Sequence, residues 1–161
     1  MIIIGIDPGT AETGFGVINC QGKNLKLVAL GKICTTTKDS PSKRLASIYQ
    51  QTLDLLKNHQ PYVLAIESLF FNINAKSASA VGQAIGVIKL AAAHRSLDVF
   101  EYPPLKIKMK LVGSGRAEKS QVQSKVRKAL RLRKIPRPTH AADALAAAIC
   151  HWLEINRKQG L

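Results

Sequence analysis

The sequence predicts an α/β domain whose helices flank a β-sheet, and three observations support this class. The chain opens with a run of β-branched residues, Ile2 to Ile6, and a turn at Asp7-Pro8-Gly9 separates it from a second apolar run, Phe15 to Ile18. A further run of strand length, Tyr62 to Ile66, follows a segment with helical periodicity. Because a chain of 161 residues can bury a single large core, we expect residues 1–161 to form one domain.

The first quarter of the chain is predicted to form three strands, followed by a helix. The two opening runs are predicted to be strands joined by a tight turn, and Leu25 to Cys34 adds a third strand to give an antiparallel meander. Ser40 is the candidate N-cap of the helix, and Pro41 is its first residue. Apolar residues continue at helical spacing until Pro61, so we expect this helix to lie on the sheet.

Two of the predicted strands end in a carboxylate. Asp7 follows the first strand directly, and Glu67 follows Ile66. In a parallel pair of strands both side chains emerge at the same sheet edge, where open α/β sheets place their sites. Taken alone, Asp7 has an alternative role as a turn residue that accepts hydrogen bonds from backbone amides.

The next predicted helix, Ala75 to about Leu97, is rich in small residues. Ala78, Gly82 and Gly86 are spaced by four along one face. Glycine costs a helix roughly 1 kcal/mol relative to alanine, so we expect something to approach this face closely. Packing on the protein's own sheet and a homodimer interface both explain the pattern.

The chain is strongly basic, with 24 Lys and Arg residues against 10 Asp and Glu residues and a formal net charge of +14. Such a field attracts polyanions, usually nucleic acid, and a surface that serves only solubility is the alternative. Half of the cations lie between Lys106 and Arg137. This basic region follows a predicted short strand at Asp98 to Tyr102, and Pro103-Pro104 opens a new helix at its start. A helix in this region has an apolar stripe of Val122, Val126, Ala129 and Leu130.

The last predicted helix has Thr139 as its N-cap and runs from His140 to about Arg157. His140 and Asp143 are three residues apart and share one face, and the alanines around them allow close packing on a sheet. Taken alone, Asp143 has the alternative role of complementing the positive end of the helix.

The cysteines and the hydropathy pattern indicate a soluble, cytoplasmic protein. Cys20, Cys34 and Cys150 lie in apolar segments without metal-type spacing, so we expect buried thiols in a reducing compartment. The opening apolar run has no basic leader, unlike a signal peptide. The stretch Ala141 to Leu153 is too short to span a bilayer, so no membrane association is expected.

Carboxylates that converge repel one another unless a cation lies between them. Asp7, Glu67 and Asp143 are three of only 10 acidic residues, and oxygen ligands favour Mg²⁺ or Mn²⁺ over Zn²⁺. With nucleic acid as the substrate, this set predicts two-metal phosphodiester hydrolysis, in which one ion activates water and the other stabilises the leaving 3′-oxygen.

Several segments, in chain order, resemble the RuvC family of Holliday-junction resolvases: Gly5-Ile6-Asp7-Pro8-Gly9, Thr13-Gly14-Phe15-Gly16, Ile66-Glu67, Ala117 to Val122 and Ala141 to Ala146. The resemblance implies a ribonuclease H-like fold, a five-stranded mixed sheet flanked by helices. It also implies a homodimer that nicks two opposed strands of a four-way DNA junction in recombination and repair, with the RuvA and RuvB branch-migration complex as partner.

The resemblance gives Asp7, Glu67 and Asp143 as catalytic, metal-binding carboxylates that hold two Mg²⁺ ions per site, with Mn²⁺ as a substitute. His140 occupies a fourth catalytic and metal-binding position, where many members have Asp. A neutral imidazole removes one negative charge and prefers softer metals. We therefore expect activity that falls at mildly acidic pH or that favours Mn²⁺.

The resemblance also implies DNA contacts. Lys108 and Lys119 match lysines that contact phosphate beside the active site, and Phe70 matches an aromatic wedge that stacks at the opened junction centre. Core packing is the alternative for Phe70 and Phe71. With the turn at Gly113 to Arg116, the expected DNA-binding set is Phe70, Lys106, Lys108, Lys110, Arg116 and Lys119.

Three other functions compete with a junction resolvase. A strand followed by Asp-x-Gly-Thr also opens sugar kinases and other actin-like ATPases, but those folds duplicate the domain, and this sequence has no second phosphate loop. A catalytically inactive junction-binding protein would bind DNA without cleaving it. Another ribonuclease H-like nuclease is the third alternative.

Overall fold

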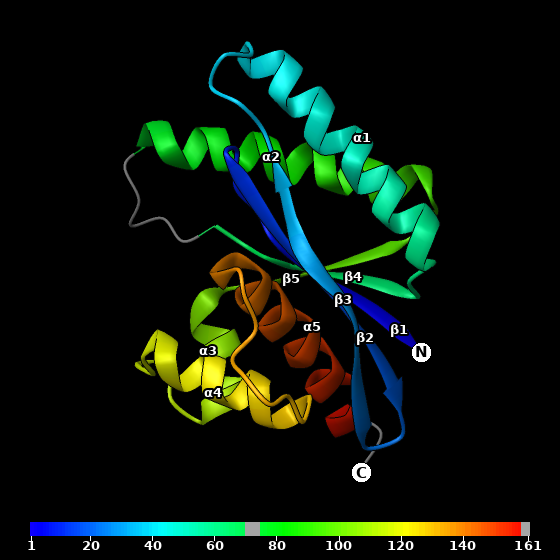
Figure 1. Ribbon diagram of the computed structural model, residues 1–161, viewed down its shortest axis with the longest axis vertical. Coiled ribbons are helices and arrows are strands. Elements are labelled where there is room, and N and C mark those ends of the chain that lie inside the picture. The colour runs from blue at the N-terminus through cyan, green and yellow to red at the C-terminus, as the bar shows by residue number, and fades with distance from the viewer. Residues whose placement is uncertain (70–74, 159–161) are drawn as a thin grey trace.

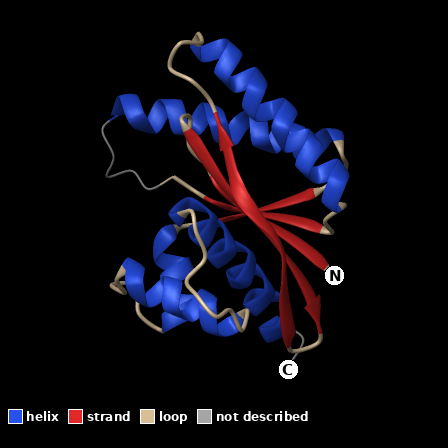
Figure 2. Cartoon of the chain, in the orientation of Figure 1, coloured by secondary structure: helices blue, strands red, loops and turns tan. Residues whose placement is uncertain are grey.

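The structure is a computed structural model that describes residues 1–69 and 75–158 (Figure 1). Its strands form one mixed sheet in the order β3-β2-β1-β4-β5 (Figure 2). β1, β2 and β3 make an antiparallel meander, and β4 and β5 continue the sheet in parallel with β1. This arrangement confirms the expected five-stranded mixed sheet. The strand bounds are β1 Ile2–Asp7, β2 Glu12–Gln21, β3 Asn24–Cys34, β4 Val63–Glu67 and β5 Asp98–Tyr102.

Helices cover both faces of the sheet (Figure 1). α1 (Pro41–His59) and α2 (Ala75–His94) lie on one face. α3 (Pro104–Val112), α4 (Lys119–Ala129) and α5 (Thr139–Lys158) lie on the other. Within the described ranges, none of the helices has the length and apolar character that crossing a membrane requires.

Alternate residues of β1 face two separate cores. Ile4 and Ile6 lie in the core under α1 and α2, whereas Ile3 lies in the core under α3, α4 and α5. Because side chains alternate along a strand, Gly5 and Asp7 share the α5 side of the sheet with Ile3. Asp7, the last residue of this buried strand, therefore lies on the face of the sheet that α5 covers.

Two glycines let α5 lie very close to the sheet. A Cβ at Gly5 would overlap the carbonyl oxygen of Ala144, and a Cβ at Gly14 would overlap the backbone of His140. The helix complements these glycines with alanines that are fully or almost fully buried: Ala141, Ala142, Ala144, Ala146, Ala147 and Ala148. Backbone therefore rests nearly on backbone, which fixes the height of α5 above β1 and β2.

The N-terminus of α1 agrees with the sequence prediction. The side-chain oxygen of Ser40 accepts a hydrogen bond from the Lys43 amide at 3.4 Å, and Pro41 is the first helical residue. Ile48 and Leu56 of α1 share a core with the sheet, and α1 also packs along α2.

Three local expectations were wrong. Cys34 is exposed because it ends β3, the edge strand, whereas Cys20 and Cys150 are buried. Thr139 is the first helical residue rather than the cap, since the amide of Ala141 already donates to the carbonyl of Pro138 at 3.0 Å. Ala129 is exposed at the end of α4, outside the expected apolar stripe.

The close approach of α5 predicts that Gly5→Ala destabilises the protein. The added methyl group would overlap the Ala144 carbonyl oxygen, and backbone cannot move aside as a flexible side chain can. We expect a loss of about 3 kcal/mol in the free energy of unfolding, measured by urea denaturation. Gly115→Ala is the matched control, because its methyl group would make only ordinary contact with Leu105. Equal stability of the two variants would contradict the prediction.

Candidate active site

Asp7 and Glu67 lie side by side at the ends of parallel strands. The register pairs Gly5 with Ala65 and Ile6 with Ile66, so the next residue on each strand is the carboxylate. Both side chains are on the α5 face, two residues beyond Gly5 and Ala65. The structure therefore places both carboxylates at one edge of the sheet, as the strand ends in the sequence predicted.

A buried threonine holds the turn that follows Asp7. The hydroxyl of Thr13 donates to the Gly9 carbonyl at 2.6 Å and accepts from the Gly9 amide at 3.2 Å. Thr13 is completely buried. This clip ties the start of β2 to the turn and so limits the positions that Asp7 can adopt.

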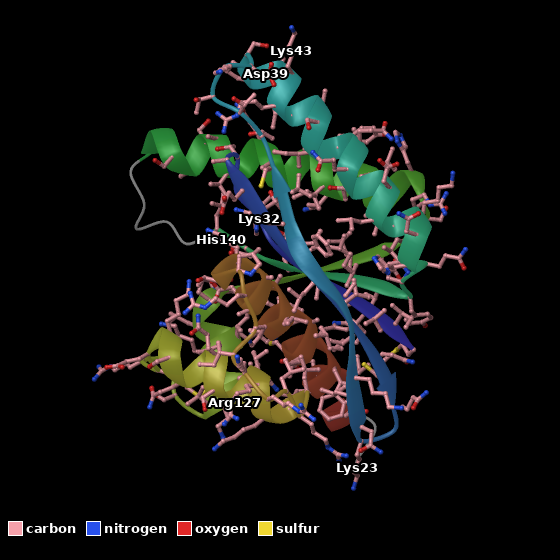
Figure 3. The ribbon with its side chains drawn as sticks, in the orientation of Figure 1. Lys23, Lys32, Asp39, Lys43, Arg127 and His140 are labelled. Carbon is pink, nitrogen blue, oxygen red and sulfur yellow. The ribbon has the colours of Figure 1, made fainter. Side chains whose placement is uncertain are left out.

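The first turn of α5 brings two further groups to Asp7. His140 Nδ1 lies 2.8 Å from Asp7 Oδ2. One potential ligand atom from each of Asp7, His140 and Asp143 lies within 4.8 Å of the others. Figure 3 shows His140 at the start of α5, close to the sheet. The alternative roles of Asp7 and Asp143, as a turn residue and a helix-end residue, do not explain this convergence.

Burial and mutual repulsion raise the pKa values of the strand-end carboxyls. Desolvation is the largest cause of the raised pKa of Glu67, about 7, and the charges of Asp7 and Asp143 raise it further. Desolvation also raises the pKa of Asp7, although the hydrogen bond with His140 opposes this. Both carboxyls thus hold protons more tightly than free side chains do, mainly because burial disfavours their charged forms.

Two lysines complete a pocket of about 360 Å³ around these groups. Lys119 Nζ lies 2.6 Å from Asp143 Oδ2, and Lys108 lines the same pocket. Lys119 is the first residue of α4, whose start is fixed by a hydrogen bond from the Glu118 amide to the Gln121 side chain at 2.8 Å. The pocket therefore combines carboxylates with cations that suit a phosphate group.

The structure places the remaining sequence-predicted residues elsewhere. Lys106 and Lys110 lie on the other side of α3, where their ammonium groups are 3.1 and 3.2 Å from Glu154 Oε1. Arg116 is exposed in the turn between α3 and α4, and its side chain is not among those that line the pocket. Phe70 and Phe71 lie outside the described residues.

Sequence reasoning missed Glu12, a carboxylate beside the pocket. Its Oε2 lies 3.9 Å from His140 Nε2, and its other oxygen pairs with Lys32. In the sequence, Glu12 stands two residues before Gly14 and so shares its face of β2. This spacing places Glu12 near the pocket only once α5 is known to rest on Gly14.

The donor set fits divalent cations. Asp7, Glu67 and Asp143 offer hard oxygen atoms, and His140 offers one nitrogen. Burial raises the pKa of Glu67 and the charges of Asp7 and Asp143 raise it further, so a cation that binds among these carboxylates would offset both costs. Such a set beside lysines, on a protein of net charge +14 and on this mixed sheet, defines a nuclease of the ribonuclease H-like fold.

Comparison with known proteins identifies the family. The family described as crossover junction endodeoxyribonuclease RuvC matches residues 3–151. A relative of that name from Natranaerobius thermophilus is 50% identical over 151 residues, which cover 94% of each chain. Another, from Alkaliphilus oremlandii, is 47% identical over 151 residues, 94% of this chain and 92% of its own. The chain belongs to the RuvC family.

Solved structures agree with this assignment. The RuvC structure of Thermus thermophilus is 34% identical in sequence with a TM-score of 0.92, and the match covers 98% of this chain and 97% of that one. RuvC of the same organism in complex with a Holliday junction substrate gives a TM-score of 0.90 at 31% identity, covering 98% and 96%. These matches confirm the predicted fold class.

The raised pKa of Glu67 predicts how the stability of the metal-free protein depends on pH. The folded carboxyl titrates at about 7 and the free one at 4.5. Stabilisation that is complete below the free pKa is therefore lost as the pH rises through the folded pKa. We expect Tm in EDTA to fall between about pH 5 and about pH 8, and Glu67→Gln to remove part of this fall.

The matched control is Glu101→Gln, which removes an exposed carboxylate paired with Lys89. It should leave the pH dependence of Tm unchanged. If Glu67→Gln and the parent protein lose stability equally over this pH range, the prediction is wrong.

Proposed function

We propose that this chain is a structure-selective endonuclease that resolves four-way DNA junctions by paired, symmetric nicks in homologous recombination and DNA repair. The observation that carries the proposal is the pocket in which Asp7, Glu67 and Asp143 meet Lys108 and Lys119. Family membership supports the choice of substrate, because the relatives are named crossover junction endodeoxyribonucleases and one solved relative holds a Holliday junction.

The cofactor we propose is a pair of Mg²⁺ ions per site, with Mn²⁺ able to replace them. Asp7, Glu67 and Asp143 would hold the ions through oxygen, and His140 through nitrogen. Such ions lower the pKa of a water molecule that attacks the phosphodiester and stabilise charge on the leaving 3′-oxygen. The proximity of the ligand atoms of Asp7, His140 and Asp143, within 4.8 Å, supports this set.

The protein's own cations serve the substrate. Lys108 and Lys119 line the pocket with the carboxylates, where a phosphate would enter. Lys119 pairs with Asp143, and a cation bound to that carboxylate would release its ammonium group to the phosphate. The exposed Arg116 lies in the adjacent turn, and we propose that it contacts the DNA backbone farther from the cleaved bond. Lys106 and Lys110 share Glu154, so their contribution is reduced by that carboxylate.

Two further family expectations belong to this proposal. Phe70 is the proposed wedge at the junction centre, in the segment between β4 and α2. The RuvA and RuvB branch-migration complex is the partner that membership of the family implies.

Asp7→Asn should abolish cleavage while leaving junction binding intact. The substitution keeps the shape of the side chain but removes the charge needed to hold a cation. With Mg²⁺ or Mn²⁺, we expect symmetric nicking of a labelled mobile four-way junction, no cleavage of linear duplex of the same sequence, and at least a ~100-fold slower rate in the variant. EDTA should stop the parent enzyme.

Asp54→Asn is the matched control, because Asp54 is an exposed carboxylate on α1 that accepts a hydrogen bond from Gln50. It should cleave at the parent rate. Junction binding without cleavage by the parent protein in any metal would instead favour the catalytically inactive junction-binding protein. Cleavage of linear duplex at the same rate would favour another ribonuclease H-like nuclease.

We propose that the enzyme is a homodimer and that α2 forms its interface. A Cβ at Gly82 would touch Leu69 of the same chain at 3.4 Å, whereas a Cβ at Gly86 would meet nothing within 4 Å. Leu90, four residues further along the same face, is 48% exposed. Packing within the chain, against Leu69 in the loop after β4, thus accounts for Gly82 but not for Gly86, which supports a second copy as the neighbour of this face.

Gly86→Arg should therefore give a folded monomer. The side chain enters open space in one chain, so the fold should be retained, but it would block close approach of a second helix. We expect light scattering after size exclusion to report a dimer for the parent protein and a monomer for the variant. Ala46→Arg, at an exposed position of α1, is the control and should stay dimeric. A dimeric Gly86→Arg protein would contradict this interface.

A further inference from the structure

Glu12 lies beside His140 because of the way β2 is built. It stands two residues before Gly14 on β2, and side chains at this spacing share one face of a strand. The backbone of His140 rests on Gly14, where a Cβ would overlap it. The side chain of Glu12 is therefore adjacent to the histidine that α5 presents to the pocket.

Lys32 orients this carboxylate. In the β2–β3 ladder Glu12 is opposite Cys34 and Gly14 is opposite Lys32, so Glu12 and Lys32 are diagonal neighbours on one face. Lys32 Nζ pairs with Glu12 Oε1. The second oxygen, Oε2, is left to face His140 Nε2 at 3.9 Å. Figure 3 shows Lys32 on β3 and His140 on α5.

The ring of His140 thus has a carboxylate on each side. Nδ1 is 2.8 Å from Asp7, within the potential ligand group, and Nε2 faces Glu12, which is outside that group. The hydrogen bond from Lys32 lowers the pKa of Glu12, and an ionised carboxylate can only accept. The 3.9 Å separation exceeds a hydrogen bond by about 1 Å, a gap that a small rotation or one water molecule closes.

A neutral imidazole can bind a cation only through the nitrogen that carries no proton. Nδ1 donates to Asp7 Oδ2 at 2.8 Å when that carboxylate is ionised. For Nδ1 to bind a cation next to Asp7, its proton must move to Nε2, and a carboxylate that accepts from Nε2 favours this tautomer. Carboxylates behind metal-ligating histidines fix the ring and its tautomer in this way.

We propose that Glu12, held by Lys32, is a positioning residue that favours the His140 proton on Nε2 and so allows Nδ1 to exchange its contact with Asp7 for a bond to the divalent cation. The inference rests on the proposed metal site and goes beyond its ligands. Glu12 touches neither cation nor substrate, and it acts only through the imidazole.

The test is a Mn²⁺ titration, read from the electron paramagnetic resonance signal of free Mn²⁺, so that affinity is measured without cleavage. Glu12→Gln should weaken Mn²⁺ binding about 10-fold in the parent protein. In the His140→Asp background, which has no imidazole to position, the same change should alter affinity less than about 2-fold. Glu101→Gln, which breaks the similarly exposed Lys89–Glu101 pair, is the matched control and should leave affinity unchanged.

Two results would overturn the inference. An equal loss in both backgrounds would mean that Glu12 acts through its charge alone, and an unchanged affinity in the parent would mean that it does not act on His140. The proposed function fails differently, since a parent protein that binds no Mn²⁺ lacks the metal site itself. Unaltered Tm values of the Glu12→Gln proteins would exclude unfolding as the cause of any loss.

Discussion

The contact of the α5 backbone with β1 and β2 determines the rest of the site. Gly5 and Gly14 remove the side chains that would hold the helix away, and the alanines of α5 remove those that would project from it. This contact gives up apolar area that larger side chains would bury, at roughly 25 cal/mol per Å². Leu145 and Ile149, both almost fully buried, supply bulk in the same core. In exchange, a helix-borne carboxylate and an imidazole come within ligand distance of a strand-end carboxylate.

The close approach of α5 brings acidic groups near enough to repel one another. In this protein nearby lysines, rather than the overall charge, offset that repulsion. The net charge of +14 is spread over the chain, and salt screens exposed charges over about 10 Å at 0.1 M. The lysines that matter for the site are those within the pocket, Lys108 and Lys119. Lys106 and Lys110 lie two residues either side of Lys108, but residues two apart on a helix do not share a face, and both bind Glu154 instead. A basic segment therefore divides into lysines that face the site and lysines that stabilise the contact of α3 with α5.

The predictable parts of this structure are those with local causes. The ends of β1 and β4, with Asp7 and Glu67, followed from apolar runs and the rule for parallel strands, and the start of α1 followed from Ser40 and Pro41. The errors at Thr139 and Ala129 are local, at helix ends, whereas the features that the sequence did not indicate depend on contacts between distant segments. Cys34 is exposed because β3 is an edge strand, and the pairing of Lys106 with Glu154 depends on the packing of α3 on α5. Glu12 was missed for the same reason, since nothing in the sequence near it indicates that His140, 128 residues later, would lie beside it.

The sheet links the chemistry to the proposed dimer. Leu64 and Ile66 of β4 pack in the core with α2, whereas Ala65 and Glu67 face α5 and the pocket. A five-residue strand thus has the helix of the proposed dimer interface on one face and a proposed catalytic carboxylate on the other. Packed cores resist deformation, so in a dimer formed through the outer face of α2 the separation of the two pockets is set by one helix contact and two rigid layers. Symmetric nicking of two opposed strands requires a fixed separation of this kind, because each site must meet its phosphate while the other is engaged.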